Sequence, residues 1–163
     1  FEKLATTPLT RPEWLVGQTL VNVAVIGLAG LLVLALMALL TGATIVLTPT
    51  SVALLVLFVA VGVALFCGFG ALIGSFAGSQ DGVIAASNGI ALPLLFLSET
   101  FVPTAMLPGW LPTGLSPLTY FSRGVRAVAT GESTGVAVEN LAVLAVVGVA
   151  FFFAGAMALP RTD

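Results

Sequence analysis

The sequence predicts an all-α integral membrane protein, with four transmembrane helices and an extracellular segment of re-entrant and amphipathic helices. Of the 163 residues, 59% are hydrophobic and only 7% are charged, whereas an ordinary soluble domain has roughly 25% charged residues. No Asp, Glu, Lys, Arg or His occurs from Trp14 to Gln80. A stretch of that length is enough for two membrane crossings of about 20 residues each.

The first predicted span covers residues 14–40 and follows a cytoplasmic segment at 1–13. Thr10-Arg11-Pro12-Glu13 has the pattern of a capping box, with Thr10 as the N-cap, Glu13 three residues later, and Pro12 in the tolerant first turn. Trp14 is the expected interface anchor. The helix should end near Thr41-Gly42.

The second predicted span covers residues 51–75, after an external loop at 41–50. Thr48-Pro49-Thr50-Ser51 signals its start, and the short connection makes the first two spans a hairpin. Glycines recur every four residues on one face, at Gly70, Gly74 and Gly78. Small residues in this pattern let membrane helices approach closely, so we expect this face to pack against another helix, either of a missing part of the protein or of a second copy. A functional hinge is the alternative.

The third and fourth spans are predicted at residues 83–98 and 137–159, separated from their neighbours by a cytoplasmic loop at 76–82 and followed by a cytoplasmic tail at 160–163. Pro93 should kink the third span. Ser87 and Asn88 are candidates for the substrate path, although Asn88 can equally serve in an interhelical hydrogen bond. Four spans place both termini on one side. Three basic residues on that side against two on the other favour a cytoplasmic position.

Residues 99–136 are too broken to form a span, because four prolines and three glycines fall between Thr100 and Ala127. Yet this stretch holds no charge before Arg123. Non-helical backbone at membrane depth persists only where protein buries it or where it lines a watery cavity. The segment is therefore either re-entrant beside the other helices or held in the headgroup layer by its aromatic residues.

A further helix is predicted from Ser116-Pro117 to Gly131. It is amphipathic, with an apolar face and a polar sector. The apolar face holds Leu118, Phe121, Val125 and Val128, and the polar sector holds Thr119, Ser122, Arg123 and Arg126. The two arginines are three residues apart and can reach lipid phosphates, Glu99 or Glu132. Trp110 and Tyr120 are expected at the headgroup level.

These residues resemble those of a known family. Phe101-Val102-Pro103, Leu107-Pro108-Gly109-Trp110-Leu111-Pro112 and Ser116-Pro117-Leu118-Thr119-Tyr120 with Arg126 are similar to the signature of ABC transporter type-2 permeases, particularly the subgroup of drug exporters that includes daunorubicin-resistance permeases. Leu4 to Glu13 resembles the segment that leads into the third span of the same family. Thr100 stands where many relatives have Gly.

The resemblance implies a six-span permease of which this chain holds spans three to six. It implies contact with an ATPase subunit through Lys3, Thr7, Pro8, Arg11 and Glu13. It implies an outer gate formed by Phe101, Pro103, Leu107, Pro108, Trp110, Pro117, Tyr120, Arg123 and Arg126. It also implies a second permease copy, so that two permeases assemble with two ATPase subunits in the plasma (inner) membrane of a prokaryote.

The chain has no histidine and one cysteine, Cys67, so no Cys/His metal site or Ser/His nucleophile pair can be assembled from it. Cys67 is expected to be a small buried hydrophobe. No basic run supports nucleic-acid binding, and no Walker A sequence is present. We also expect spans without an ionisable residue for proton coupling.

Together these features favour a non-enzymatic exporter subunit for an amphiphilic drug, lipid or glycan. It would contact membrane lipid, hold no cofactor itself, and be driven by ATP and Mg²⁺ on a partner. A membrane scaffold or assembly subunit and a passive channel or facilitator are the alternatives. The polar residues Gln18, Thr19, Asn22, Ser87 and Asn88 supply less of a polar stripe than a channel would need.

Overall fold

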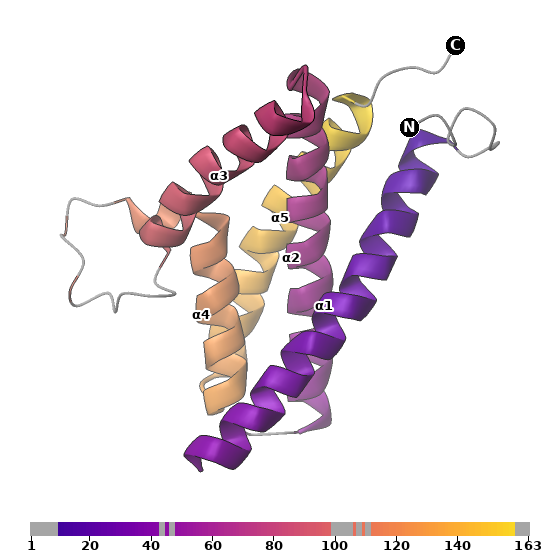
Figure 1. Cartoon of the computed structure of the whole chain (residues 1–163). Helices are drawn as coiled ribbons and strands as arrows, with labels where there is room; N and C mark the ends of the chain where they lie inside the picture. The colour runs from indigo at the N-terminus through magenta and orange to yellow at the C-terminus, as the bar shows by residue number, and fades with distance from the viewer. Residues whose placement is uncertain are drawn as a thin grey trace.

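The computed structural model describes residues 10–42, 45, 48–98, 106, 109 and 112–158, and of Arg11 the backbone alone. These residues form α-helices and a short 3₁₀ turn, with no strand among them (Figure 1). The elements in chain order are α1 (Arg11–Thr41), α2 (Pro49–Phe76), α3 (Gln80–Leu97), η2 (Thr113–Leu115), α4 (Pro117–Thr130) and α5 (Thr134–Ala158). Helices α1, α2, α3 and α5 are long and apolar enough to cross a membrane. The predicted all-α membrane fold with four spans is confirmed.

Local capping explains where α1 and α2 begin and end. The backbone N–H and the hydroxyl of Thr10 each donate to Oε2 of Glu13 at 2.7 Å, as the capping box predicts. Thr48 Oγ1 accepts from the Ser51 backbone N–H at 3.1 Å and starts α2. Gly42 ends α1 with φ of 65°, a left-handed conformation that glycine adopts without steric cost.

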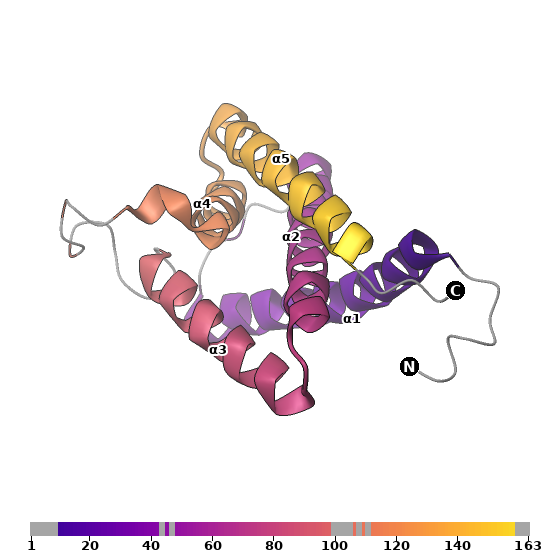
Figure 2. The same cartoon turned by 90° about the horizontal axis from the view of Figure 1, so that it is seen from above.

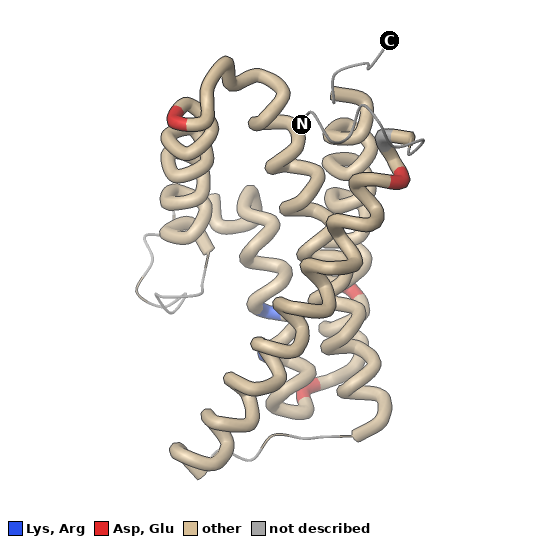
Figure 3. The backbone as a smooth tube through the Cα atoms, turned by 45° about the vertical axis from the view of Figure 1, so that its right-hand side comes forward, with Lys and Arg blue, Asp and Glu red and all other residues tan. Residues whose placement is uncertain are grey.

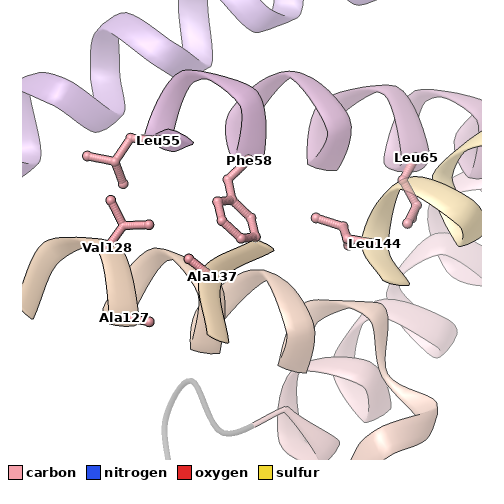
Figure 4. Close-up of a cluster of buried hydrophobic side chains, with 7 residues drawn as sticks. All are labelled: Leu55, Phe58, Leu65, Ala127, Val128, Ala137 and Leu144. Carbon is pink, nitrogen blue, oxygen red and sulfur yellow. The ribbon is translucent and has the colours of Figure 1, made fainter. Parts of the chain in front are cut away.

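Helices α2, α4 and α5 pack together and enclose the core (Figure 4). Its fully or nearly buried side chains are Leu55, Phe58 and Leu65 of α2, Ala127 and Val128 of α4, and Ala137 and Leu144 of α5. Helix α1 lies against α2, and much of its surface is exposed. The long exposed apolar face of α1 fits a lipid environment, where apolar side chains need no burial in protein.

Helix α3 leans away from this core (Figures 1 and 2). It contains no buried residue. It begins at Gln80, three residues before the predicted start, because Ser79 Oγ accepts from the Gly82 N–H at 3.1 Å and caps it. The predicted loop at 76–82 is therefore reduced to the residues around Gly78. Pro93 lies inside the helix.

The helix ends define two sides of the bundle (Figure 1). The start of α1, the connection from α2 to α3 and the end of α5 lie at one side, here called the α2–α3 side. The end of α1, the start of α2 and the turn from α4 to α5 lie at the other, here called the α4–α5 side. Helix α3 ends partway along the bundle, and α4 runs from that level to the α4–α5 side.

Candidate functional site

Three fully buried hydroxyl residues lie where the end of α3 meets the start of α4, here called the α3–α4 joint. Ser98, Ser116 and Thr119 each have 0% exposure. The Ser116 hydroxyl donates to the Leu94 carbonyl at 3.0 Å, across 22 residues of sequence, and the Thr119 hydroxyl donates to the Thr113 carbonyl at 2.8 Å. Backbone that leaves a helix at membrane depth needs such internal partners, because lipid offers none.

The hydroxyl of Ser98, at the same joint, donates to the Leu95 carbonyl at the end of α3 at 2.7 Å. Thr119 was expected in the polar sector of the amphipathic helix and is instead buried, so that assignment is wrong. Its hydroxyl donates to the Thr113 carbonyl of η2 and makes no contact with solvent. The sequence identified Ser116 as a helix start and Thr119 as a polar residue of that helix, but it gave no sign that these hydroxyls, or that of Ser98, would be buried.

An apolar cavity of about 410 Å³ lies beside this joint, between α2, α3, α4 and α5. Phe66, Phe69, Tyr120 and Phe151 contribute aromatic side chains to its wall. Phe69 and Phe151 meet edge to face, with ring centroids 5.3 Å apart. Tyr120 is half-buried and packs against the core, and its position at the headgroup level stays a prediction.

Helix α4 is held against α2 by a glycine. A Cβ atom at Gly124 would overlap the ring of Phe58, which is fully buried, so the ring lies directly on the α4 backbone. Phe58 also meets Phe121 edge to face at 6.3 Å between centroids. The start at Pro117 and the end at Gly131, with φ of 73°, agree with the predicted helix.

The opposite face of α4 carries Arg123 and Arg126, both exposed. Figure 3 shows basic residues on this helix and acidic residues on and near α5. No ion pair joins Arg126 to Glu132 among the residues that the structure describes. Glu99, the other predicted partner, lies outside them.

Of the remaining outer-gate residues, Phe101, Pro103, Leu107, Pro108 and Trp110 fall outside the described part of the chain. The same holds for three of the residues assigned to ATPase contact, Lys3, Thr7 and Pro8. Within the described part, Glu13 accepts two hydrogen bonds from Thr10. Its carboxylate is thus occupied in starting α1.

The glycines spaced four residues apart, Gly70, Gly74 and Gly78, face open space within the described part of the chain. A Cβ atom at Gly70, Gly74 or Gly78 would meet no described atom within 4 Å. Gly70 and Gly74 line an open groove of about 550 Å³ that also contacts Trp14 and Gln18. Packing of this face against a helix of another chain stays a prediction.

Different glycines make the close helix contact inside the chain. A Cβ atom at Gly68 would lie 2.5 Å from the Phe151 carbonyl oxygen, and one at Gly155 would collide with the backbone of Gly68. Helices α2 and α5 therefore touch backbone to backbone at this point. The sequence signal for it was the pair Gly148 and Gly155, seven residues apart on one face of α5.

The polar residues within the spans have varied environments. Asn88 is exposed and Ser87 half-buried, and neither lines the cavity between α2, α3, α4 and α5. Among the described residues Asn88 makes no hydrogen bond. In contrast, the Asn22 amide of α1 donates to Sγ of Cys67 in α2 at 3.5 Å. Cys67 is half-buried, and its thiol accepts a hydrogen bond between two helices in addition to packing as an apolar side chain.

Glu139 lies within α5, one turn beyond its start, and is exposed. The expectation that the spans hold no ionisable residue is therefore wrong at this position. Its neighbour Asn140 is buried and donates to the Val136 carbonyl at 2.7 Å. No group of His, Cys, Asp and Glu that could hold a metal ion occurs among the described residues.

No significant match to the chain is found among curated proteins or solved structures. A family model described as ABC-2 type transporter matches residues 1–129. That range covers α1 to the end of α4 and includes both segments whose residues resemble this family. The match agrees with the four apolar helices, and the chain belongs to the ABC-2 type transporter family.

Proposed function

We propose that this chain is the permease subunit of an ATP-binding-cassette exporter, which moves an amphiphilic drug, lipid or glycan across the plasma membrane of a prokaryote. The family match carries this proposal. The absence of a Walker A sequence supports a separate ATPase subunit as the site of ATP and Mg²⁺. A second permease copy and a cytoplasmic position for the start of α1 and the end of α5 complete the proposed assembly, which places the α4–α5 side outside.

Coupling to the ATPase is assigned to the residues before α1. Replacing Lys3, Thr7 and Arg11 together by Ala should abolish nucleotide-driven export while the permease still inserts into the membrane. Arg161→Ala with Thr162→Ala, at the other terminus on the same side, is the matched control and should export normally. Export by the first variant at the control rate would contradict the assignment.

The same preparation separates the proposed exporter from its alternatives. An ATPase subunit should co-purify with the complete permease, and substrate efflux should require ATP. A scaffold would show no efflux, and a channel would show efflux without ATP.

The segment between α3 and α4 is proposed as an outer gate. Met106 is 77% exposed, so Met106→Cys in a Cys67→Ser background should react with a membrane-impermeant maleimide from outside. Trp110→Cys tests the same segment at a second position. The rate should change when nucleotide is bound.

Ser133→Cys in the exposed turn between α4 and α5 is the control, and its rate should not depend on nucleotide. A nucleotide-independent rate at Met106 and Trp110 would leave the segment as a static cap. Labelling only from the cytoplasm would overturn the orientation.

A further inference from the structure

An apolar groove separates α1 from α4 and has α2 as its floor. Its volume is about 510 Å³. Gly27, Gly30 and Leu34 of α1, Val59 of α2, and Phe121 and Val125 of α4 contribute to the lining. The groove is open along α1, because a Cβ atom at Gly30 would meet no described atom within 4 Å and one at Gly27 only Val59 at 3.7 Å.

The groove has the length of one membrane leaflet. Its α1 wall extends from Val23 to Leu34, which is about 16 Å at a rise of 1.5 Å per residue. Half of a hydrocarbon core about 30 Å thick is about 15 Å. Every residue that lines the groove is apolar. An acyl chain therefore fits this space without leaving a polar group unpaired.

A positive charge stands at the edge of the groove. Arg126 follows Val125 directly, is exposed, and makes no ion pair with the residues that the structure describes. It lies four residues before the last residue of α4, and so about 6 Å below the α4–α5 end of that helix. An arginine at this depth extends its guanidinium to the headgroup level, where it can hold a phosphate by paired hydrogen bonds.

Among the described residues, the acidic residue closest to Arg126 in sequence is Glu132. It lines a separate small pocket with Thr48, Ser51 and Thr134, at the start of α2. Arg126 is therefore the basic residue beside the groove toward the α4–α5 side.

We propose that this groove is a binding site for an anionic phospholipid of the leaflet at the α4–α5 side, with the phosphate on Arg126 and one acyl chain between α1 and α4. The site does not depend on which molecule the permease exports. It predicts that the permease selects anionic over zwitterionic lipid at this position.

The test uses a tryptophan placed in the groove. Leu28 lines the groove and is 70% exposed, so Leu28→Trp should be accommodated, in a background where Trp14 and Trp110 are replaced by Phe. The full chain is reconstituted in phosphatidylcholine vesicles that contain brominated phosphatidylglycerol or, at the same fraction, brominated phosphatidylcholine. Bromine on the acyl chains quenches tryptophan fluorescence on contact. We expect stronger quenching by the anionic lipid.

Arg126→Gln should weaken the preference for the anionic lipid about five-fold, the factor expected for one cation near an anionic surface. Gly30→Leu should reduce quenching by filling the groove. Gly17→Leu is its control, since Gly17 lies on the same helix where a Cβ atom also meets no described atom within 4 Å, and it should quench like the parent.

Three results would overturn the proposal. Absence of quenching by both lipids would show that protein, such as a second copy, covers the groove. Equal quenching by the two lipids, unchanged in Arg126→Gln, would show ordinary lipid contact without a site. Equal quenching in the Gly30→Leu and Gly17→Leu variants would place the acyl chain outside the groove. The Arg126→Gln comparison stands even if Gly30→Leu fails to fold.

Discussion

The contact between α2 and α5 leaves no room for a methyl group at Gly68. A Cβ atom there would lie 2.5 Å from the carbonyl oxygen of Phe151 and from Cα of Phe152. Both are backbone atoms, so no change of rotamer can relieve the overlap. We predict that Gly68→Ala forces the two helices apart and destabilises the bundle.

The size of the effect follows from the separation required. Carbon atoms pack best at about 3.5–4.0 Å, so the helices must move apart by about 1 Å, which forfeits a quarter to a half of each local dispersion contact. If about 50 atom pairs contribute about 0.15 kcal/mol each, losing a third costs about 2.5 kcal/mol. Overpacked cores typically lose about 1–3 kcal/mol. In lipid no hydrophobic gain offsets the loss, because lipid tails are as apolar as the side chains.

Gly70→Ala is the matched control, two residues further along the same helix. A Cβ atom at Gly70 meets no described atom within 4 Å, and alanine is a better helix former than glycine by up to about 1 kcal/mol. The measurement is thermal unfolding of the purified chain in detergent, followed by tryptophan fluorescence. A cost of about 2.5 kcal/mol corresponds to a midpoint lower by about 5–10 °C for a chain of this size. If Gly68→Ala and Gly70→Ala unfold at the same temperature, the backbone contact does not support the bundle.

Three further variants test other parts of the structure. Gly124→Ala should destabilise the chain by pushing α4 off the Phe58 ring, and adding Phe58→Leu should recover part of the loss in a double-mutant cycle; additive effects would contradict the contact. Ser116→Ala removes the bond to the Leu94 carbonyl and should cost about 0.6–1 kcal/mol, whereas Thr130→Ala, whose hydroxyl bonds within its own exposed helix turn, should cost less. Glu139→Gln should leave the pH dependence of export unchanged, because ATP drives the proposed transport; a shifted pH profile would indicate proton coupling.

Helix ends were predictable because their causes are local. Thr10 with Glu13, Thr48 with Ser51, and the two left-handed glycines Gly42 and Gly131 all act within a few residues of sequence. The start of α3 was placed too late because Gln80 and Asp81 are polar and were assigned to a loop. Asp81 in fact suits the first turn of a helix, where a negative charge meets the positive end of the helix dipole.

The contacts between helices were predictable only in part. The four-residue spacing of Gly70, Gly74 and Gly78 identifies a face with small side chains, but it does not say which helix covers that face. Gly68 is not part of this spacing, and its contact with α5 depends on Gly155, 87 residues away. Thr119 was misplaced for the same reason, since which sector of α4 faces α2 and α5 depends on the position of Phe58.

The α3–α4 joint constrains how the proposed outer gate can work. Ser116 is fully buried and bonded to the last turn of α3, and Thr119 is bonded to η2. Because α4 is also pinned to α2 at Gly124 and Phe58, its first turn cannot follow a movement of the preceding segment without losing buried hydrogen bonds, and lipid would not replace them. Any gating motion should therefore be confined to residues before Thr113, with the α3–α4 joint as its fixed end. Nucleotide-dependent labelling should then appear at Met106 and be absent at a cysteine placed at exposed Leu115; equal responses at both positions would mean that the joint itself moves.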